Sequence, residues 1–434
     1  MNIFLDKMKA LLGDEFDDFL KFYNSSGEHY RGLRVNTLKC SVEKLEKLLD
    51  FDLKSAPFCS ESFYIPNEIT SLGNNPLHHA GAFYIQEPSA SSAVTMLDVQ
   101  EGDYVLDLCA APGGKSTQLG AAMAGQGLLV CNEPVPKRAQ ILSRNVERMG
   151  ITNALVVSAM PDQLAGCWPE GFDAVQVDAP CSGEGMFRRH PETRDEWSPE
   201  QAAGCAKRQA EILNAAAKLV RPGGRMVYST CTLNPVENEN VVADFLDRHG
   251  DFTLAAFRLP GAEAPQGMLI CYPHRMRGEG HFVALLHRAG DGVAVLKRDA
   301  SLPAPDKEQI RVYRAFAGEH APQPTHVLGE TLTAMAECPD VRGVRVLRCG
   351  LHLGGVRGKV FQPDHAWAVA ADTPNFPRVE LDETQAMRYL KGEMLNVQEE
   401  LRGWVLPTYA GLCLGWGKCS DGQMKNHYPK GLRK

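Results

Sequence analysis

The stretch VLDLCAAPGGKST (residues 105–117) joins a short apolar run to a tight turn and the start of a helix. Two interpretations of this turn compete. Its end, Gly114-Lys115-Ser116, matches a phosphate-binding P-loop, but that motif needs glycine at the position of Cys109. Small residues at 110, 111, 113 and 114 let the backbone approach a ligand closely, and a helix N-terminus attracts an anionic group such as a carboxylate. The turn therefore favours a nucleoside cofactor over a P-loop or a plain structural connection.

Strands and helices alternate on both sides of this turn. The expected strands are 104–108, 128–132, 154–157, 172–177 and 225–229, and the expected helices are 115–124, 135–149 and 198–220. Short apolar strands that alternate with helices are typical of a parallel, doubly wound sheet. Such a sheet binds ligands at the carboxyl ends of its strands. The pattern predicts an α/β fold with a Rossmann-like core.

The segments before and after this core follow other patterns. The first of them shows helical periodicity at 2–23, a strand at 32–36 and a helix at 41–49, which predicts a small α/β module. The last is rich in β patterns. The expected units are an RRM-like N-terminal module at 1–75, the Rossmann-like core at 76–290, a Gly-, Pro- and charge-rich linker at 291–310, and a β-rich C-terminal region at 311–434.

Composition excludes several classes of protein. The charge is 46 − 53 = −7, which excludes a globally basic nucleic-acid coat and leaves local basic patches for any nucleic-acid contact. No apolar run approaches the roughly 18 to 20 residues of a membrane helix, and the acidic start does not resemble a secretory signal. We therefore expect no membrane contact. The 13 cysteines form no C-x-x-C pair, so we expect no metal and a reducing, cytoplasmic location.

Glu133 directly follows the second predicted strand of the core. An acid at that strand end accepts hydrogen bonds from ribose hydroxyls in dinucleotide-binding folds. The structural alternative is an exposed glutamate next to an ordinary βα turn. Together with the small-residue turn, Glu133 favours a site for a nucleoside cofactor.

Two cysteines follow apolar strands, Cys181 within Asp178-Ala179-Pro180-Cys181 and Cys231 within Ser229-Thr230-Cys231. Most cysteines of this chain are expected to be small buried hydrophobes. Two thiols at neighbouring strand ends beside an aspartate are harder to explain in that way. Methylation of cytosine at C5 uses a thiolate that adds to C6, an acid near N3, and a base that removes the C5 hydrogen. The residues therefore fit this chemistry, although they do not tell which thiol is the nucleophile.

Three segments, DLCAAPGGKST, DAPCSGEGMFR and YSTCTLNPVENE, resemble the signature motifs of the Nol/Nop/Sun (Fmu) family of RNA cytosine-C5 methyltransferases. RVNTLK, FYIQEPSA and YPHRMRGEGHF also resemble segments of that family, and the C-terminal region is similar to the RsmF-like branch that acts on bacterial 16S ribosomal RNA. The resemblance covers nearly the whole chain. It implies an S-adenosylmethionine-dependent methyltransferase sheet with a small N-terminal α/β module and a C-terminal β-rich, PUA-like RNA-binding module.

The resemblance also assigns residues. Cys231 corresponds to the nucleophile, Cys181 to the thiol needed for release, and Lys115 to a residue that orients the base or Asp178. Asp178 is the residue type that the chemistry needs near N3 and is the fourth expected catalytic residue. Residues implied to hold S-adenosyl-L-methionine are Cys109, Ala110, Ala111, Pro112, Gly113, Gly114, Lys115, Glu133, Arg138 and Asp178. One departure concerns adenine, because the family has an aspartate where this chain has Ala159 or Met160. Either Asp162 or main-chain groups would then make that contact.

Basic residues in two places are candidate RNA contacts, with a solvated helix end and a disordered basic tail as the alternatives. The first group, Arg188, Arg189, His190 and Arg194, follows the Cys181 motif. The second group lies in the tail, where aromatic side chains offer surfaces for stacking bases. It comprises Lys418, Lys425, Lys430, Arg433 and Lys434 with Trp416, His427 and Tyr428.

Three functions remain to be distinguished. The expected one is methylation of cytosine in RNA by a monomeric enzyme, with 16S ribosomal RNA or the small ribosomal subunit as the partner. Transfer RNA or 23S ribosomal RNA is the alternative substrate for the same reaction. The second is a non-catalytic ribosome-assembly factor, which would be expected to lack a thiol or to have a broken cofactor turn. The third is a DNA cytosine methyltransferase, in which Cys181 of the Pro-Cys turn would be the nucleophile; the RNA-type tail argues against it.

Overall fold

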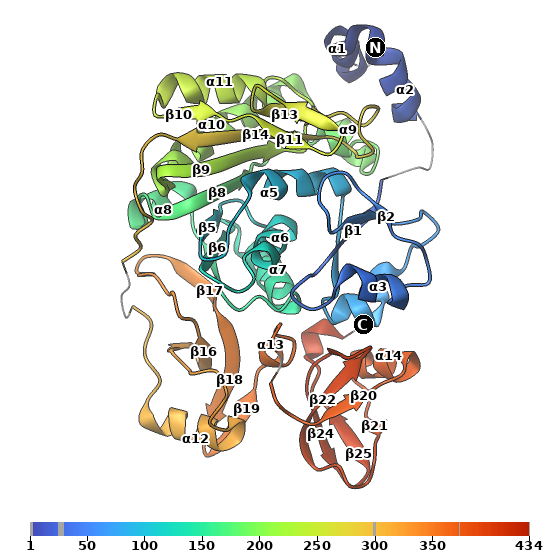
Figure 1. The fold of residues 1–434 in the computed structure, drawn as a ribbon, viewed down its shortest axis with the longest axis vertical. Coiled ribbons are helices and arrows are strands. Elements are labelled where there is room, and N and C mark those ends of the chain that lie inside the picture. The colour runs from blue at the N-terminus through green and yellow to red at the C-terminus, as the bar shows by residue number, and fades with distance from the viewer. Residues whose placement is uncertain (1–2, 25–29, 298–300, 373, 434) are drawn as a thin grey trace.

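A nine-stranded sheet runs through the middle of the protein (Figure 1). In this computed structural model, which describes residues 3–24, 30–297, 301–372 and 374–433, the strand order is β10-β14-β9-β8-β5-β6-β7-β17, and β13 pairs with β14. Its strands are β5 (Tyr104–Asp107), β6 (Leu128–Asn132), β7 (Ala154–Ser158), β8 (Phe172–Asp178), β9 (Val220–Thr230), β10 (Phe252–Leu254), β13 (Met268–Cys271), β14 (His281–Arg288) and β17 (Arg345–Cys349). Strands β5 to β9 pair in parallel, which confirms the predicted Rossmann-like core.

The order of the parallel strands places a ligand crevice beside β5. The chain continues from β5 to β6 and β7 on one side, and then crosses to β8 and β9 on the other side. The carboxyl ends of β5 and β8 therefore border the point at which the strand order reverses, where open α/β sheets bind ligands. The turn at 108–113 and the Asp178 segment both lie at this point.

Helices cover both faces of the sheet (Figure 1). Apolar side chains of one helix group pack with Val105, Leu129 and Val227, and those of the other group pack with Leu106, Val130 and Met226. The first group is α5 (Ser92–Leu97), α6 (Gly114–Ala122) and α7 (Pro136–Arg148), and the second is α8 (Pro161–Cys167), α10 (Pro199–Leu219) and α11 (Glu239–Arg248). The Ser198 side chain accepts a hydrogen bond from Gln201 N and caps α10, as the sequence predicts. The remaining elements of this part are η4 (Glu184–Met186), α9 (Pro191–Glu196), β11 (Phe257–Leu259) and β12 (Ala262–Ala264).

The N-terminal segment forms two separate bodies. The prediction of one helix at 2–23 was wrong, because Gly13 adopts a positive φ of 53° and interrupts it; the two resulting helices pack through Phe4 and Phe19 against Phe187 near the carboxyl edge of the central sheet. The rest forms a sheet of order β2-β3-β1-β4. The elements are α1 (Ile3–Leu12), η1 (Gly13–Glu15), α2 (Phe16–Asn24), β1 (Gly32–Val35), α3 (Val42–Leu48), β2 (Lys54–Ser55), β3 (Ser62–Tyr64), η2 (Leu72–Asn74), α4 (Pro76–His79), β4 (Phe83–Gln86) and η3 (Pro88–Ser91).

The C-terminal part contains two small sheets below the core in Figure 1. Apolar residues of the last sheet, such as Val405 and Met424, share one buried cluster with Leu33 and Phe83 of the N-terminal sheet. The elements are α12 (Lys307–Ala317), β15 (His326–Leu328), β16 (Thr331–Ala334), β18 (Leu351–Arg357), β19 (Val360–Pro363), α13 (His365–Ala368), β20 (Arg378–Glu380), α14 (Glu383–Lys391), β21 (Leu395–Asn396), β22 (Gly403–Tyr409), β23 (Leu412–Cys413), β24 (Gly417–Ser420), β25 (Gln423–Asn426) and η5 (Lys430–Leu432). In the described ranges, no helix has the length and apolar character needed to cross a membrane.

Candidate active site

The turn after β5 is held in one shape by contacts from α7. Gly113 has a φ of 115°, a conformation that only glycine adopts easily. A Cβ at this position would lie 3.2 Å from Leu142 Cδ1 and 3.4 Å from Asn145 Cβ. The Asn145 side chain donates a hydrogen bond of 2.8 Å to Pro112 O. The turn therefore presents backbone atoms without a side chain to the ligand crevice, as expected for a cofactor site.

The start of α6 is anchored by Arg34, which comes from β1 of the N-terminal sheet. Its guanidinium donates to Gly114 O at 2.8 Å and to Thr117 Oγ1 at 2.8 Å, and the residue is only 2% exposed. Sequence reasoning placed Arg34 in the expected strand at 32–36 and in the RVNTLK segment, and gave it no role in the site. The contact means that the N-terminal module helps to shape the cofactor turn.

Glu133 lies at the carboxyl end of β6 and faces the same turn. It is 3% exposed, and its Oε1 accepts a hydrogen bond of 2.9 Å from Val135 N. Arg138 lies 3.3 Å from Glu133 Oε2 and also donates to Ala111 O at 3.1 Å. Arg138 therefore connects the acid to the turn, so both residues implied for the cofactor lie beside it.

The position expected to contact adenine carries no carboxylate. Ala159 N donates to Asn132 Oδ1 at 3.0 Å, and Asn132 Nδ2 donates to Ala159 O and to Leu108 O, each at 3.1 Å. Met160 is 63% exposed, and Asp162 is exposed in the first turn of α8. Asn132 was not singled out from the sequence, although a polar side chain at the end of a buried strand was the available signal.

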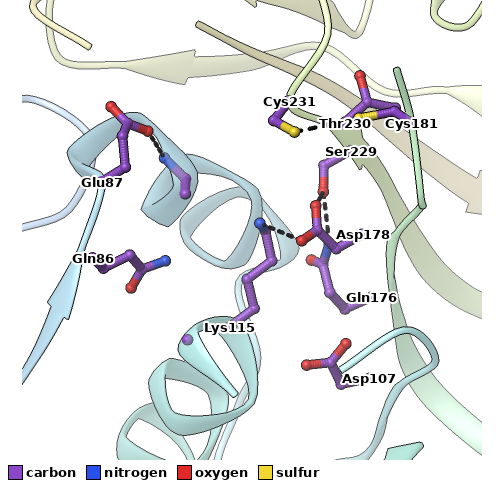
Figure 2. Close-up of polar contacts among 12 residues, drawn as sticks. Gln86, Glu87, Asp107, Lys115, Gln176, Asp178, Cys181, Ser229, Thr230 and Cys231 are labelled. Carbon is purple, nitrogen blue, oxygen red and sulfur yellow. Dashed lines mark hydrogen bonds and ion pairs between the residues drawn. The ribbon is translucent and has the colours of Figure 1, made fainter. Parts of the chain in front are cut away.

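Lys115 and Asp178 form an ion pair between α6 and the end of β8 (Figure 2). Lys115 Nζ lies 2.9 Å from Asp178 Oδ2, and the Ser229 hydroxyl donates to Asp178 Oδ1 at 2.9 Å. Burial alone would raise the pKa of Asp178, but the Lys115 ammonium and the bond from Ser229 hold it below its ordinary value. Asp178 is therefore an ionised acceptor at neutral pH.

The two cysteines singled out from the sequence lie side by side. Cys181 Sγ and Cys231 Sγ are 3.3 Å apart, and Figure 2 shows both next to the Asp178 and Lys115 pair. Both residues are partly exposed. The hydrogen bond with Cys231, followed by burial, raises the pKa of the Cys181 thiol well above its ordinary value, so Cys181 keeps its proton at neutral pH.

A buried carboxylate ties the two cysteine loops together. Glu237, which is 0% exposed, accepts hydrogen bonds from Ser182 N at 2.8 Å and from Gln209 Nε2 at 3.1 Å. Gln209 also donates to Pro180 O at 3.0 Å. Neither Glu237 nor Gln209 was identified from the sequence as part of the site. Their contacts set the position of the Cys181 loop relative to the Cys231 loop.

The other cysteine implied in the cofactor turn, Cys109, has a different environment. Burial, together with the charge of Asp107, raises the pKa of its thiol, so it is a structural neighbour of the cofactor site rather than a nucleophile. Asp107 is fully buried, and its Oδ1 accepts no hydrogen bond from any residue that the structure describes. Its Oδ2 accepts from Ser116 Oγ at 2.6 Å.

Several candidate RNA contacts lie elsewhere than expected. Arg188 faces inward, 3.6 Å from Glu279 and stacked on the Phe22 ring at 3.8 Å, whereas Arg189 is exposed. His190 pairs with Glu192 at 3.1 Å and Arg194 with Asp195 at 3.8 Å. Arg188 thus stabilises the fold and does not offer its charge to a phosphate.

The tail is ordered as the pair of strands β24 and β25, and not a disordered basic end. Trp416 is 1% exposed and Tyr428 is 4% exposed, so neither ring is free to stack on a base. Lys418 and Lys425 face each other across the two strands, and both are exposed. The charges of this tail remain candidates for RNA contact, but two of its aromatic residues belong to the core. Lys434 lies outside the described residues.

One cluster elsewhere bears on the expectation that no metal is present. In the described part of the chain, the ligand atoms of His326, Cys338 and Cys349 lie within 4.8 Å of one another. Both cysteines belong to the apolar core of the protein. The absence of a metal therefore stays a prediction.

Comparison with known proteins covers almost every part of this chain. Its segments match models described as the N-terminal domain of 16S rRNA methyltransferase RsmF (2–88), 16S rRNA methyltransferase RsmB/F (94–287), the first C-terminal domain of RsmF (308–370) and the RsmF PUA domain (376–434). The ribosomal RNA small subunit methyltransferase F of Aeromonas salmonicida (strain A449) is 34% identical over 93% of this chain and 90% of that protein. The protein of the same name from Aliivibrio fischeri (strain MJ11) is 32% identical over 93% of this chain and 91% of that protein.

A solved structure shares the architecture of the core. The methyltransferase homolog protein from Pyrococcus horikoshii is 29% identical, with a TM-score of 0.58 over 66% of this chain and 94% of that one. The matching region thus extends beyond the central sheet, and the PUA model accounts for the last β-rich sheet.

Proposed function

This chain belongs to the family of ribosomal RNA small subunit methyltransferases F, and we propose that it methylates C5 of a cytosine in 16S ribosomal RNA. It is an S-adenosylmethionine-dependent RNA methyltransferase. The 16S target is proposed from the names of its relatives. The observation that carries the C5 chemistry is the pair of sulfur atoms 3.3 Å apart beside the Lys115 and Asp178 ion pair.

The residues around the turn fit S-adenosylmethionine. Bare backbone at Gly113 allows close approach of the ligand, and the buried Asp107 Oδ1 has acceptor capacity that the described residues do not use. Glu133, held by Arg138, offers acceptors for ribose hydroxyls. When bound, this cofactor supplies an electrophilic methyl group on a positively charged sulfur.

We assign the nucleophile to Cys231 and release to Cys181. Addition of the Cys231 sulfur to C6 makes C5 electron-rich, and this activates a carbon that is otherwise a poor nucleophile. Asp178 can accept a hydrogen bond from the exocyclic amino group of cytosine beside N3, and Lys115 holds that carboxylate in place. The raised pKa keeps Cys181 protonated before the reaction starts.

The assignment is tested by two single substitutions. Cys231→Ala is expected to abolish 5-methylcytosine formation in 16S ribosomal RNA. Cys181→Ala is expected to accumulate a covalent complex of protein and RNA, which runs as a shifted band on a denaturing gel. If Cys231→Ala still methylates, or if the adduct depends on Cys181, the DNA-type order of the two thiols is correct instead.

The alternative of a non-catalytic assembly factor is separated by cofactor binding. Calorimetric titration with S-adenosylmethionine is expected to show saturable heat for the enzyme and none for a pure RNA-binding protein. Bisulfite mapping of ribosomal RNA from cells with and without the gene then identifies the modified position. A map that does not change with the gene would reject 16S ribosomal RNA as the target.

Further parts of the proposal concern location and assembly. We propose a monomer in the cytoplasm that contacts RNA through the exposed Arg189 and through the charges of the tail, including Lys418 and Lys425. The domain bounds expected from the sequence, and the source of the adenine contact, stay predictions.

A further inference from the structure

His281, the first residue of β14, is buried next to the active site and has no role in the mechanism above. The residue is 2% exposed. Its Nε2 atom is buried and makes no hydrogen bond to any residue that the structure describes. A buried polar atom without a partner is costly and calls for an explanation.

The strand register brings His281 close to the start of the Cys231 loop. Phe282 pairs with Thr230 and Val283 pairs with Ser229 in the antiparallel ladder between β14 and β9. His281 precedes Phe282 and Cys231 follows Thr230, so the two residues come directly after the last pair of the ladder. Directly opposite residues of a ladder, such as Val283 and Ser229, point to the same face of the sheet.

That face is the one that carries the active site. Ser229, whose hydroxyl donates to Asp178, lies opposite Val283, and His281 precedes Val283 by two residues in β14 and so has the same parity. The loop before His281 is fixed close to Cys231: a Cβ on Gly185 would lie 2.7 Å from Gly280 O and 2.9 Å from Cys231 O. On the other side of that loop, Glu279 N donates to Glu87 Oε1 at 3.0 Å. The backbone that leads into His281 is therefore held close to the backbone of Cys231.

The charged groups that act on His281 come from two elements. Burial, with the ammonium of Lys115 on α6, lowers the pKa of His281 to about 3, and the carboxylate of Asp178 on β8 opposes this change. The imidazole is thus neutral at pH 7 and has one ring nitrogen with a free lone pair. Two other groups nearby are less suited to accept a proton. The raised pKa of Cys181 keeps its thiol protonated, and the carboxylate of Asp178 is already bonded to Lys115 and Ser229.

We propose that His281 is the base that accepts the proton of the Cys231 thiol when the sulfur adds to the cytosine ring. This rests on the proposed function and adds a residue to it. In this step the S–H bond breaks and the S–C6 bond forms. The π electron pair of C5=C6 moves to C5 and is delocalised through C4 toward N3, and the proton goes to a ring nitrogen of His281. Negative charge that develops on the ring favours the imidazolium and opposes the effect of Lys115.

The experiment isolates the addition step in the Cys181→Ala background, where the covalent complex accumulates. The rate of complex formation with S-adenosylmethionine and 16S ribosomal RNA is measured on denaturing gels. Adding His281→Gln or His281→Ala is expected to slow this rate by at least about 100-fold, the low end for general-base catalysis. Added imidazole is expected to restore part of the rate in the alanine variant only, because glutamine fills the space that imidazole would occupy.

The matched control is His352→Gln in β18. His352 also has a buried Nε2 without a hydrogen-bond partner in the described residues, and burial lowers its pKa to about 3, but it lies in a C-terminal sheet. This variant is expected to leave the rate unchanged. Calorimetric binding of S-adenosylmethionine, expected to be equal in all variants, reports that the site is folded.

The outcomes separate the two proposals. If the Cys181→Ala parent forms no complex, the assigned roles of the two thiols fail, and the role of His281 fails with them. If the parent forms the complex and the His281 variants do so at the same rate, only the role of His281 is overturned. A slower rate without imidazole rescue, or with lost cofactor binding, assigns His281 to packing and also overturns the proposal.

Discussion

Replacing Gly113 by alanine tests whether the shape of the turn after β5 holds the cofactor. The φ of 115° is strained for any residue with a Cβ, at a cost of about 1–3 kcal/mol. The new methyl group would also press on Leu142 Cδ1 at 3.2 Å and on Asn145 Cβ at 3.4 Å. If the turn relaxes to relieve this strain, the bond from Asn145 to Pro112 is disturbed and the cofactor loses its surface.

The expected result is a loss of affinity for S-adenosylmethionine of roughly 5- to 150-fold, which is 1–3 kcal/mol at 1.4 kcal/mol per factor of ten. Isothermal titration calorimetry measures it. The matched control is Gly125→Ala, because Gly125 also has a positive φ, of 79°, but a Cβ added there would meet no atom within 4 Å. The control should lose stability by a similar strain and keep its affinity. Equal affinities for Gly113→Ala and the wild type would refute the assignment of the turn to the cofactor.

The other predictions concern a buried acid, a loop contact and the tail. Burial raises the pKa of Asp107 to about 7, from an ordinary 3.8, so the folded state binds the extra proton and loses stability as the pH rises from 4 to 7. Asp107→Asn should therefore gain stability relative to the wild type over that range in urea unfolding, and a difference that does not change with pH would contradict this. Glu237→Ala leaves the backbone N–H of Ser182 without a partner, at about 1–3 kcal/mol, and leaves Gln209 Nε2 with Pro180 O as its remaining acceptor. Methylation should fall while cofactor affinity holds, and an unchanged methylation rate would count against the loop contact. Lys425→Ala should weaken RNA binding and lower the slope of log affinity against log salt by about one, without shifting the unfolding curve; an unchanged slope would remove Lys425 from the RNA interface.

Local patterns were sufficient to predict the core. The strands at 128–132 and 172–177 and the cap at Ser198 follow from short-range signals, and the structure confirms them within a residue or two. The two thiols were also predicted to meet, because residues after neighbouring parallel strands share one edge of the sheet. Their 3.3 Å separation agrees with that argument.

Contacts between distant segments could not be predicted in this way. Arg34 reads as one basic residue in a strand, and only the fold shows that it binds the start of α6. Arg188 and Trp416 were predicted to contact RNA from charge and aromaticity alone. In the fold, residues that are distant in the sequence pack around both side chains and bury them. The break at Gly13 shows the same limit, because helical spacing on both sides concealed the turn between α1 and α2.

Strand β17 has a consequence for how the protein reaches its target. It comes from the C-terminal half, yet it pairs with β7 at the edge of the central sheet, and Arg348 within it donates to Ser143 Oγ of α7 at 3.3 Å. A chain cut before residue 345 would expose the backbone of β7 and is expected to self-associate through that edge. In the whole protein, this pairing joins the C-terminal half to the edge of the central sheet, and the last sheet shares a buried cluster with the N-terminal sheet. Contact of RNA with the tail, as proposed above, would then influence which nucleotide reaches the two sulfur atoms.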